Sequence, residues 1–467
     1  MENYNSKDAR SIFEYSKKLL GHCLRDFTPR DYEPRKGKGG LGEMVEEIYF
    51  GYEKNSNPDA DFSAAGLELK CTPLKQSKKN EWLIKERLVC GMIDYVKEAG
   101  NDFEHSHFYE KCRLMLLLFY LNFASKNTLD LEFVYSVLWQ LPETDLLIIK
   151  QDYEIIHRKI REGLAHTLSE GDTMYLGACR KGTKGDDVTR QYNSDIPAPT
   201  RAFCLKMAYM RTILEYVKQS GTNAVSNMQL PLSGEAVTVE SLKTKTFDEI
   251  ILERFHPYMH KDEHSIALEL GIDLSNGCKS KFYQIANAIA NNGQHSNINK
   301  SEEFLKAGMM MKTIRMQANG RIKESMSFEN INYQEVFDND NWFESRLYEI
   351  FTSRFLFVVF KEQTRNSNDY TLEKVFFWTM PPEDLRMANL YWENIRNNVM
   401  NNVFDPKDYW AASLHQYFHV RPKGRNSNDL TENPNGGLCK KYCYWFNSEY
   451  VSKIILENNC ELDSHEK

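Results

Sequence analysis

Asp61, Glu68 and Lys70 are the residues whose types and spacing best suit chemistry. Glu68 and Lys70 lie two residues apart in an apolar run, so a β-strand would place both side chains on one face, with Leu67 and Leu69 on the other. Asp61 precedes Glu68 by seven residues, across a short loop that can bring the two carboxylates together. Mg²⁺ prefers oxygen ligands and keeps several waters, so two carboxylates and a scissile phosphate oxygen suit its octahedral shell. The spacing predicts a Mg²⁺ site at which Lys70 orients or deprotonates the water that attacks a phosphodiester.

Glu46 and a basic string are further candidates. Glu46 follows Gly42 by four residues on a predicted helix, and it could supply another carboxylate to the same site or simply face solvent. An E-x-K tripeptide is itself common as a charge pair on an exposed strand. The string 180–185 (RKGTKG) could enter a DNA groove, where Arg and Lys donate to guanine, or could be a plain surface loop. The residues alone leave these alternatives open.

The bulk composition indicates a folded protein of about two or three domains. Its 467 residues are 41% hydrophobic and 27% charged, which is typical of a globular protein. A net charge of −7 argues against a protein that coats nucleic acid through a general positive field, but a specific DNA enzyme can have a local basic cleft. The ten cysteines form no CxxC pair, and a metal site at His419, Cys439 and Cys443 would lack its fourth ligand. Free thiols are therefore expected.

The sequence predicts no membrane segment. The longest apolar run, Leu114–Leu121, has eight residues, whereas a membrane-spanning helix needs about 20. The N-terminus shows neither the basic region nor the apolar region of a secretory signal. We therefore expect a cytoplasmic protein with no membrane partner, and Leu114–Leu121 is predicted to be a buried strand.

The two halves of the chain share short strings at a constant offset of 242 residues. Ala65–Lys70 aligns with Ala307–Lys312, and Tyr175–Gly182 aligns with Tyr417–Gly424. Two distant matches in one register indicate a duplicated domain. A stretch rich in Ser, Gly, Asn and Pro near mid-chain is typical of a linker. The predicted organisation is a domain over 1–220, a linker over 221–238 and a second domain over 239–467.

Periodicity predicts an α/β fold for each half, with a central mixed β-sheet flanked by helices. In the first half, three strands form the mixed sheet, and a further strand lies between two helical stretches. The second half is expected to repeat this plan. The expected helices lie near 6–23, after 39–42, and near 143–163 and 206–218, and the expected strands lie near 66–72, 83–93, 113–121 and 174–179.

Two motifs carry a resemblance to a known family. The pattern Lys38-Gly39-x-x-Gly42-x-x-x-Glu46, followed by Asp61-Phe62-x-x-x-Gly66-Leu67-Glu68-Leu69-Lys70, resembles the MutH group of PD-(D/E)xK nucleases. The chain is more closely similar to the Sau-three-A-type type II restriction endonucleases. The strings that carry this likeness are Gly66–Pro73, Lys85–Val89, Ile148–Arg158 and Arg201–Lys206.

The resemblance implies two tandem restriction-endonuclease-fold domains of the MutH kind. It also implies a type II enzyme that cuts double-stranded DNA at GATC with Mg²⁺. The residues that match the catalytic positions of the family are Asp61, Glu68 and Lys70, with Glu46 in a supporting role. Asp59 is a rival of Asp61 as metal ligand, and the seven-residue spacing favours Asp61.

The resemblance further implies a set of DNA contacts. Some positions match lysines that approach the DNA, and others match residues associated with reading the recognition sequence. Where the MutH pattern has Arg-Pro-Lys, the first half has Cys179-Arg180-Lys181, which leaves the role of Arg180 open. The predicted DNA-binding residues are Lys38, Glu86, Lys111, Arg180 and Lys181 in the first half and Glu324, Arg421 and Lys423 in the second.

The second half departs from the catalytic pattern. Met310 stands where Glu68 stands, and Glu303 stands where Asp61 stands, so this half is expected to bind DNA without cutting it. In the related enzymes such a domain implies a type IIE-like allosteric effector that binds a second GATC site. Because cutting a palindrome needs two active sites, we expect two chains to associate on DNA. The alternatives are a MutH-like nicking endonuclease of mismatch repair and a GATC-binding protein that does not cleave.

Overall fold

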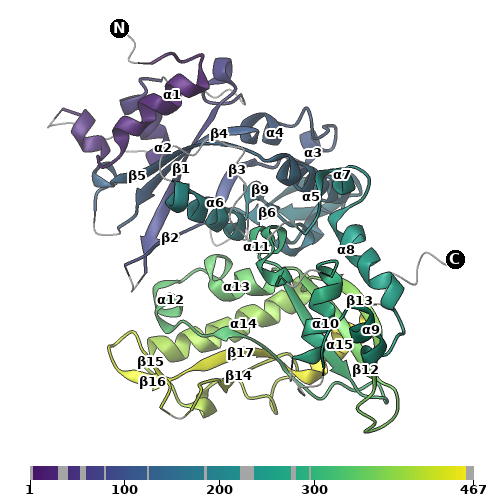
Figure 1. Cartoon of the computed structure of the whole chain (residues 1–467). Helices are drawn as coiled ribbons and strands as arrows, with labels where there is room; N and C mark the ends of the chain where they lie inside the picture. Colours follow the sequence, from purple (N-terminus) through teal and green to yellow (C-terminus); the bar gives the residue numbers. More distant parts are fainter. Residues whose placement is uncertain are drawn as a thin grey trace. The chain divides into compact units, whose positions relative to one another are not determined.

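The computed structural model describes residues 4–29, 40–52, 59–77, 80–123, 126–182, 187–220, 236–274, 280–293, 296–426 and 428–458. The chain divides into two compact units. Unit 1 contains most of the first half together with Leu305–Ala307, and unit 2 contains most of the second half together with Ser169–Gly171. In Figure 1, unit 1 is drawn mainly in purple to teal and unit 2 mainly in green to yellow. Most of the predicted linker, 221–238, lies outside the described residues.

The main sheet of unit 1 carries Glu68 and Lys70. It contains, in order, β2 (Trp82–Ile84), β1 (Glu68–Gln76), β4 (Leu114–Leu121) and β5 (Phe133–Gln140). β1 runs parallel to β4, while β2 and β5 pair antiparallel with their neighbours. β4 is apolar and almost completely buried, as expected for a central strand that is covered on both faces. The mixed sheet predicted for this half is therefore confirmed.

A second sheet of unit 1 corrects one prediction. It contains β3 (Leu88–Met92), β9 (Arg201–Leu205) and β6 (Leu176–Arg180) in that order, all antiparallel. The prediction of one strand over 83–93 is wrong, because β2 and β3 belong to different sheets. The charged residues 85–87 interrupt the apolar run at this point, so the chain leaves one sheet and enters the other. The short hairpin of β7 (Val188–Gln191) and β8 (Ser194–Pro199) follows β6.

Helices pack beside these sheets in unit 1 (Figure 1). α1 (Ala9–Ser16) begins after Asp8, whose side chain accepts a hydrogen bond from the amide of Arg10, as an N-cap does. α1 is shorter than the predicted helix over 6–23 because the chain tightens into a 3-10 turn at Lys17–Leu19. The other helices of unit 1 are α2 (Leu41–Met44), α3 (Tyr95–Glu98), α4 (His107–Cys112), α5 (Glu143–Arg161) and α6 (Met207–Ser220).

Unit 2 repeats the strand plan of unit 1. β10 (Met310–Met316) runs parallel to β12 (Phe355–Glu362), which pairs antiparallel with β13 (Tyr370–Trp378). The second sheet contains β11 (Met326–Asn330), β17 (Tyr442–Phe446) and β14 (Phe418–Pro422) in that order. β15 (Leu430–Glu432) and β16 (Leu438–Lys440) form a separate hairpin. The parallel pairs even begin alike, since Glu68 faces Met115 and Met310 faces Phe355. The predicted duplication is therefore visible in the order of the strands.

The helices of unit 2 surround a large aromatic core that includes Phe355, Phe357 and Trp378. Within the described residues, none of the helices in either unit is long and apolar enough to cross a membrane. The helices with their bounds are α7 (Val239–Leu242), α8 (Phe247–Phe255), α9 (Glu263–Glu269), α10 (Lys281–Ala290), α11 (Glu302–Ala307), α12 (Tyr333–Asp338), α13 (Arg346–Phe351), α14 (Pro382–Met400) and α15 (Ser448–Glu457).

A buried ion pair lies inside unit 1. The ammonium of Lys306 is 2.7 and 2.8 Å from the two carboxylate oxygens of Asp145, and both side chains are at most 2% exposed. The hydroxyl of Tyr209 also donates to Asp145, at 2.7 Å. Because both charges are removed from water, each depends on the other for compensation.

Candidate active site

The loop before β1 brings Asp61 next to Glu68. Phe62 and Leu67 form an antiparallel bridge, and Gly66 reverses the chain between them with a φ of +60°. As a result, a carboxylate oxygen of Asp61 accepts a hydrogen bond from the amide of Leu69 at 2.8 Å. The amide of Asp61 in turn donates to Oε2 of Glu68 at 3.3 Å. The two carboxylates that the sequence singles out therefore meet at the start of β1.

Two lysines hold the Glu68 carboxylate. The ammonium of Lys70 is 2.5 Å from Oε1 of Glu68, and the ammonium of Lys111, from α4, is 3.3 Å from the same oxygen. Glu68 is only 1% exposed, while Leu67 and Leu69 enter the core on the other face of the strand. Burial alone would lower the pKa of Lys70, but the Glu68 carboxylate outweighs burial and holds the pKa above its usual range. Lys70 is therefore firmly charged in this site.

Glu46 lies within electrostatic reach of the same group. It sits in a π-helical turn, Val45–Tyr49, that follows α2, and its side chain is half-buried. Burial and the negative charges of Asp61 and Glu68 together raise the pKa of Glu46 to about 7. Burial and Glu68 likewise raise the pKa of Asp61. Of the two alternatives left open for Glu46, its partial burial and its interaction with the charges of Asp61 and Glu68 favour a carboxylate of this cluster over a solvated helix face.

This arrangement fits a hydrated divalent cation. The carboxylates of Glu46, Asp61 and Glu68 repel one another, and a cation between them would relieve that repulsion. Among the described residues, no three or more His, Cys, Asp or Glu side chains form a ready-made metal cage. Two carboxylate ligands with waters and substrate oxygen suit Mg²⁺ better than an all-protein cage does. Asp59 is exposed, whereas Asp61 has the contacts described above.

The alternative metal site in the second half is not formed. His419 is buried and bonded through Nδ1 to the side chain of Asn447, and Cys439 donates to the carbonyl of Thr431. Cys439 and Cys443 are free thiols, as the sequence predicts.

The predicted DNA contacts of unit 1 lie in different places. Lys111 belongs to the carboxylate cluster itself. Glu86 is exposed between β2 and β3, and Arg180 is the last residue of β6. Lys181 follows, and its amide donates to the carbonyl of Thr200. Lys38 and residues 183–185 of the basic string lie outside the described residues.

Comparisons with known proteins agree with this geometry. The family model described as "DNA mismatch repair enzyme MutH" matches residues 50–152 and 293–389, once in each half. The type II restriction enzyme Sau3AI of Staphylococcus aureus is 30% identical over 97% of this chain and 99% of its own length. The chain belongs to this restriction-enzyme family. Its members are site-specific deoxyribonucleases.

MutH proteins are more distant relatives. The MutH of Shewanella amazonensis is 26% identical over 38% of this chain and 80% of its own length. The MutH of Citrobacter koseri is 24% identical over 44% of this chain and 88% of its own length. Each of these proteins therefore corresponds in length to about one half of this restriction-family chain.

In unit 2 the residue that takes the place of Asp61 is Asn299. The side-chain oxygen of Asn299 accepts a hydrogen bond from the amide of Met311 at 2.7 Å, as Asp61 does from Leu69. The prediction of Glu303 at this place is wrong. Glu303 lies in α11 and accepts hydrogen bonds from the amides at 236 and 237. A helix replaces the short turn of unit 1 here, so the constant offset fails upstream of the strand, and only an alignment that allows an insertion could find Asn299.

The other predicted residues of unit 2 lie on or near its second sheet. Glu324 forms an ion pair with Arg315. Lys423 follows β14 and donates to Oγ of Ser327 at 2.8 Å. Arg421 is exposed on β14, with its guanidinium 5.5 Å from the ring centre of Trp445. Lys423 is 5.6 Å from the same ring. Two basic side chains and an aromatic ring thus share one surface.

Proposed function

We propose that this enzyme cleaves double-stranded DNA at GATC in a Mg²⁺-dependent reaction carried out by unit 1. The observation that carries the proposal is the meeting of Asp61, Glu68 and Lys70 at the start of β1. Mg²⁺ held by Asp61 and Glu68 would polarise the scissile phosphate and make an attacking water more acidic. The GATC sequence is taken from the family resemblance.

The residues of the cluster divide the remaining work. The charged ammonium of Lys70 would offset the negative charge that builds up on the phosphorus centre. Glu46, with a pKa of about 7, is suited to accept a proton from the attacking water near neutral pH. Lys111 shares Oε1 of Glu68 with Lys70 and would keep that carboxylate in place until DNA arrives.

Unit 2, in the same proposal, binds a second GATC site as an allosteric effector and does not cut. Asn299 and Met310 replace the two carboxylates of unit 1, and a neutral amide and a thioether bind Mg²⁺ poorly. Arg421 and Lys423 keep a basic surface for DNA. One cleaving centre per chain implies that two chains associate on the palindrome. We also propose that the protein acts in the cytoplasm, where it would meet its DNA substrate.

A plasmid cleavage assay tests this function. Supercoiled DNA with one GATC site or several, methylated or unmethylated, is incubated with the protein and Mg²⁺ or with EDTA. We expect double-strand breaks at unmethylated GATC that need Mg²⁺ and are faster on DNA with several sites. The variant Asp61→Asn is expected to lose cleavage, while its matched control Asp59→Asn keeps activity within a few fold. Cleavage by Asp61→Asn and loss by Asp59→Asn would contradict the site.

A MutH-like nicking reaction is the second candidate. It is favoured by the similarity of each half of the chain to the MutH family model. Nicked circles as the only product would support it, and DNA binding without any cleavage would reject both enzyme reactions.

A further inference from the structure

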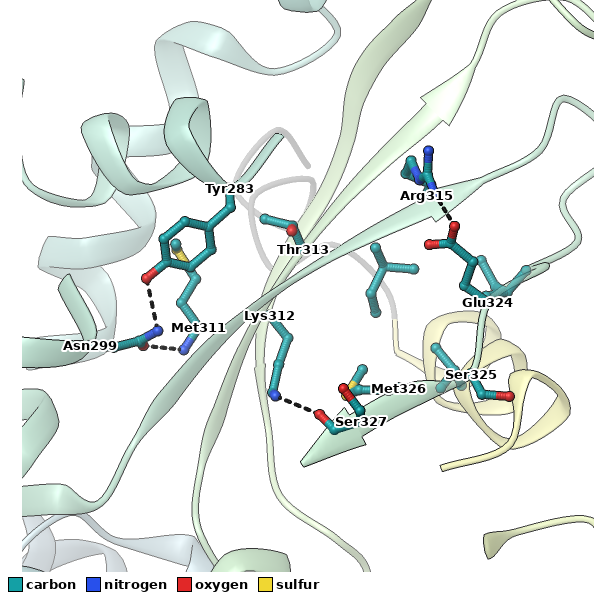
Figure 2. Close-up of a pocket in the computed structure, with 13 residues that line it drawn as sticks. Tyr283, Asn299, Met311, Lys312, Thr313, Arg315, Glu324, Ser325, Met326 and Ser327 are labelled. Carbon is teal, nitrogen blue, oxygen red and sulfur yellow. Dashed lines mark hydrogen bonds and ion pairs between the residues drawn. The ribbon is translucent and has the colours of Figure 1, made fainter. Parts of the chain in front are cut away.

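Unit 2 contains a cavity at the position of the active site of unit 1. The cavity has a volume of about 370 Å³ and is lined by β10, by the segment leading into β11 and by side chains from α10 and the loop that follows. Figure 2 shows Tyr283 and Asn299 on one side, Lys312 in the middle, and Arg315 paired with Glu324 on the other side. Lys312 is the counterpart of Lys70, two residues after Met310 on the first strand.

The charges in this cavity are reversed relative to unit 1. Around Lys70 the structure places Asp61 and Glu68. Around Lys312 the equivalent residues are Asn299 and Met310, which carry no charge. The hydroxyl of Tyr283 accepts a hydrogen bond from Asn299 at 3.0 Å. Within the described lining, Glu324 is the one carboxylate, and Arg315 already pairs with it.

Lys312 is thus a largely buried ammonium without a carboxylate partner among the described residues. Its Nζ donates to the backbone carbonyl of Ser327 at 3.0 Å and lies 4.9 Å from the ring centre of Phe328. Burial and the positive charge of Lys423 together lower the pKa of Lys312 to about 8. At neutral pH the side chain still carries its proton. Binding of an anion would stabilise a buried ammonium group that has no carboxylate partner.

Lys423 supplies a second ammonium group beside Lys312 and Ser327. Its Nζ donates to Oγ of Ser327 at 2.8 Å, while Lys312 donates to the carbonyl oxygen of the same serine. The two ammonium groups therefore converge on one residue of β11. Two lysines that repel each other across a polar residue form a suitable site for a tetrahedral oxyanion, whose several oxygens can accept from both.

We propose that this cavity binds one backbone phosphate of DNA directly through Lys312 and Lys423, without a divalent cation. The inference rests on the proposed function, in which unit 2 holds a second DNA site. It adds that the ammonium of Lys312 takes the place in unit 2 that Mg²⁺ has in unit 1. Unit 2 should therefore bind DNA even when Mg²⁺ is absent.

The test uses the full chain with Glu68→Gln to prevent cleavage, and a short GATC duplex in the presence of EDTA. Duplexes bound per chain are counted by sedimentation, and affinity is measured over a range of salt concentrations. We expect a second duplex to bind in EDTA and Lys312→Met to weaken it about tenfold or more, as for loss of a charge-assisted hydrogen bond. Met310→Glu, which gives Lys312 the partner that Lys70 has, should weaken it similarly without removing the lysine. Lys261→Met, a lysine outside the cavity, is the control.

Salt dependence measures how many phosphates are involved. Each neutralised phosphate contributes a slope of about 0.9 in log affinity against log salt. The double variant Lys312→Met/Lys423→Met should therefore lower the slope by about 0.9 and not by twice that amount, because both lysines hold one phosphate.

Several results would overturn the inference. A second duplex that binds only with Mg²⁺, or that binds Lys312→Met and Met310→Glu as tightly as the parent, would refute the direct phosphate contact while leaving DNA binding by unit 2 intact. Duplex binding in EDTA that keeps its stoichiometry and affinity in Arg421→Ala/Lys423→Ala would instead refute DNA binding by unit 2 itself. Tight binding of inorganic phosphate alone, with duplex binding unchanged in the variants, would assign the cavity to a free phosphate.

Discussion

Lys312 should reduce the stability of unit 2, and replacing it with methionine should make the unit more stable. Burial lowers the pKa of Lys312 from 10.5 to about 8. At about 1.4 kcal/mol per pKa unit, keeping the proton in the folded state at neutral pH costs about 3 kcal/mol. Met fills the space of the aliphatic stem, but the carbonyl of Ser327 loses its donor, which costs about 1 kcal/mol. The expected net gain for Lys312→Met is about 2 kcal/mol.

The gain should depend on pH in a defined direction. Below about pH 8 the lysine is charged in both the folded and the unfolded chain, so the full penalty is present. Between pH 8 and 10.5 the folded lysine has lost its proton while the unfolded one keeps it, so the stability of the parent protein rises with pH. The advantage of Lys312→Met should therefore shrink across this window.

Urea denaturation of the parent and the variant, each at about pH 7 and about pH 10, measures this effect. Lys323→Met is the control, because Lys323 is exposed and its removal should change stability by less than about 0.5 kcal/mol. A Lys312→Met variant that is less stable than the parent at neutral pH, or whose advantage is equal at both pH values, would refute the reasoning. Together with the binding test, the expected outcome is a variant that is more stable and binds DNA less well.

Three further predictions concern unit 1. Burial raises the pKa of Glu46 to about 7 together with the charges of Asp61 and Glu68, and bound Mg²⁺ would lower it. Single-turnover cleavage should therefore decline with falling pH at or below pH 7, and Glu46→Gln should abolish that limb; a limb that persists unchanged would exclude Glu46 as its source. Lys306→Met should destabilise the protein by about 3–5 kcal/mol in chemical denaturation, since it leaves the buried Asp145 carboxylate unpaired. Lys159→Met, which breaks a more exposed pair, should cost about 1 kcal/mol or less, and equal losses would contradict the role of burial. Gly66→Ala should lower both the melting temperature and the cleavage rate, because Gly66 has a φ of +60° and an added Cβ would lie 2.9 Å from Nη2 of Arg113. An unchanged melting temperature and cleavage rate would show that the turn adapts.

The sequence predicted the strand that starts the cluster because its signal is local. The alternation from Leu67 to Lys70 fixes which side chains share a face, and the seven-residue spacing allows a single turn to bring Asp61 back. The duplication could also be predicted, because the matching strings lie at the starts of β1 and β10 and along β6 and β14, which are corresponding strands of the two halves.

Other features depend on contacts that the sequence does not display. The break at 85–87 separates two sheets whose strands are paired by residues far apart in the chain, such as β3 with β9, and no local pattern announces that pairing. The ion pair of Lys111, on α4, with Glu68 could not be read from the sequence, and the DNA contact of Lys111 stays a prediction. Asn299 was missed because an extra helix shifts the alignment, so its equivalence with Asp61 follows only from the hydrogen bond to the next strand.

Asp61 and Asn299 each accept a hydrogen bond from an amide of the following strand. A comparison of the two residues distinguishes this structural role from the charge of the side chain. In unit 1 the Asp61 carboxylate accepts the amide of Leu69 and carries the charge that the proposed cation would need. In unit 2 the Asn299 side-chain oxygen accepts the amide of Met311 and carries no charge. The hydrogen bond that holds the loop to the strand is therefore kept when the side chain loses its charge. A change as small as carboxylate to amide can therefore remove charge from this position of a duplicated domain while the loop keeps its hydrogen bond to the strand.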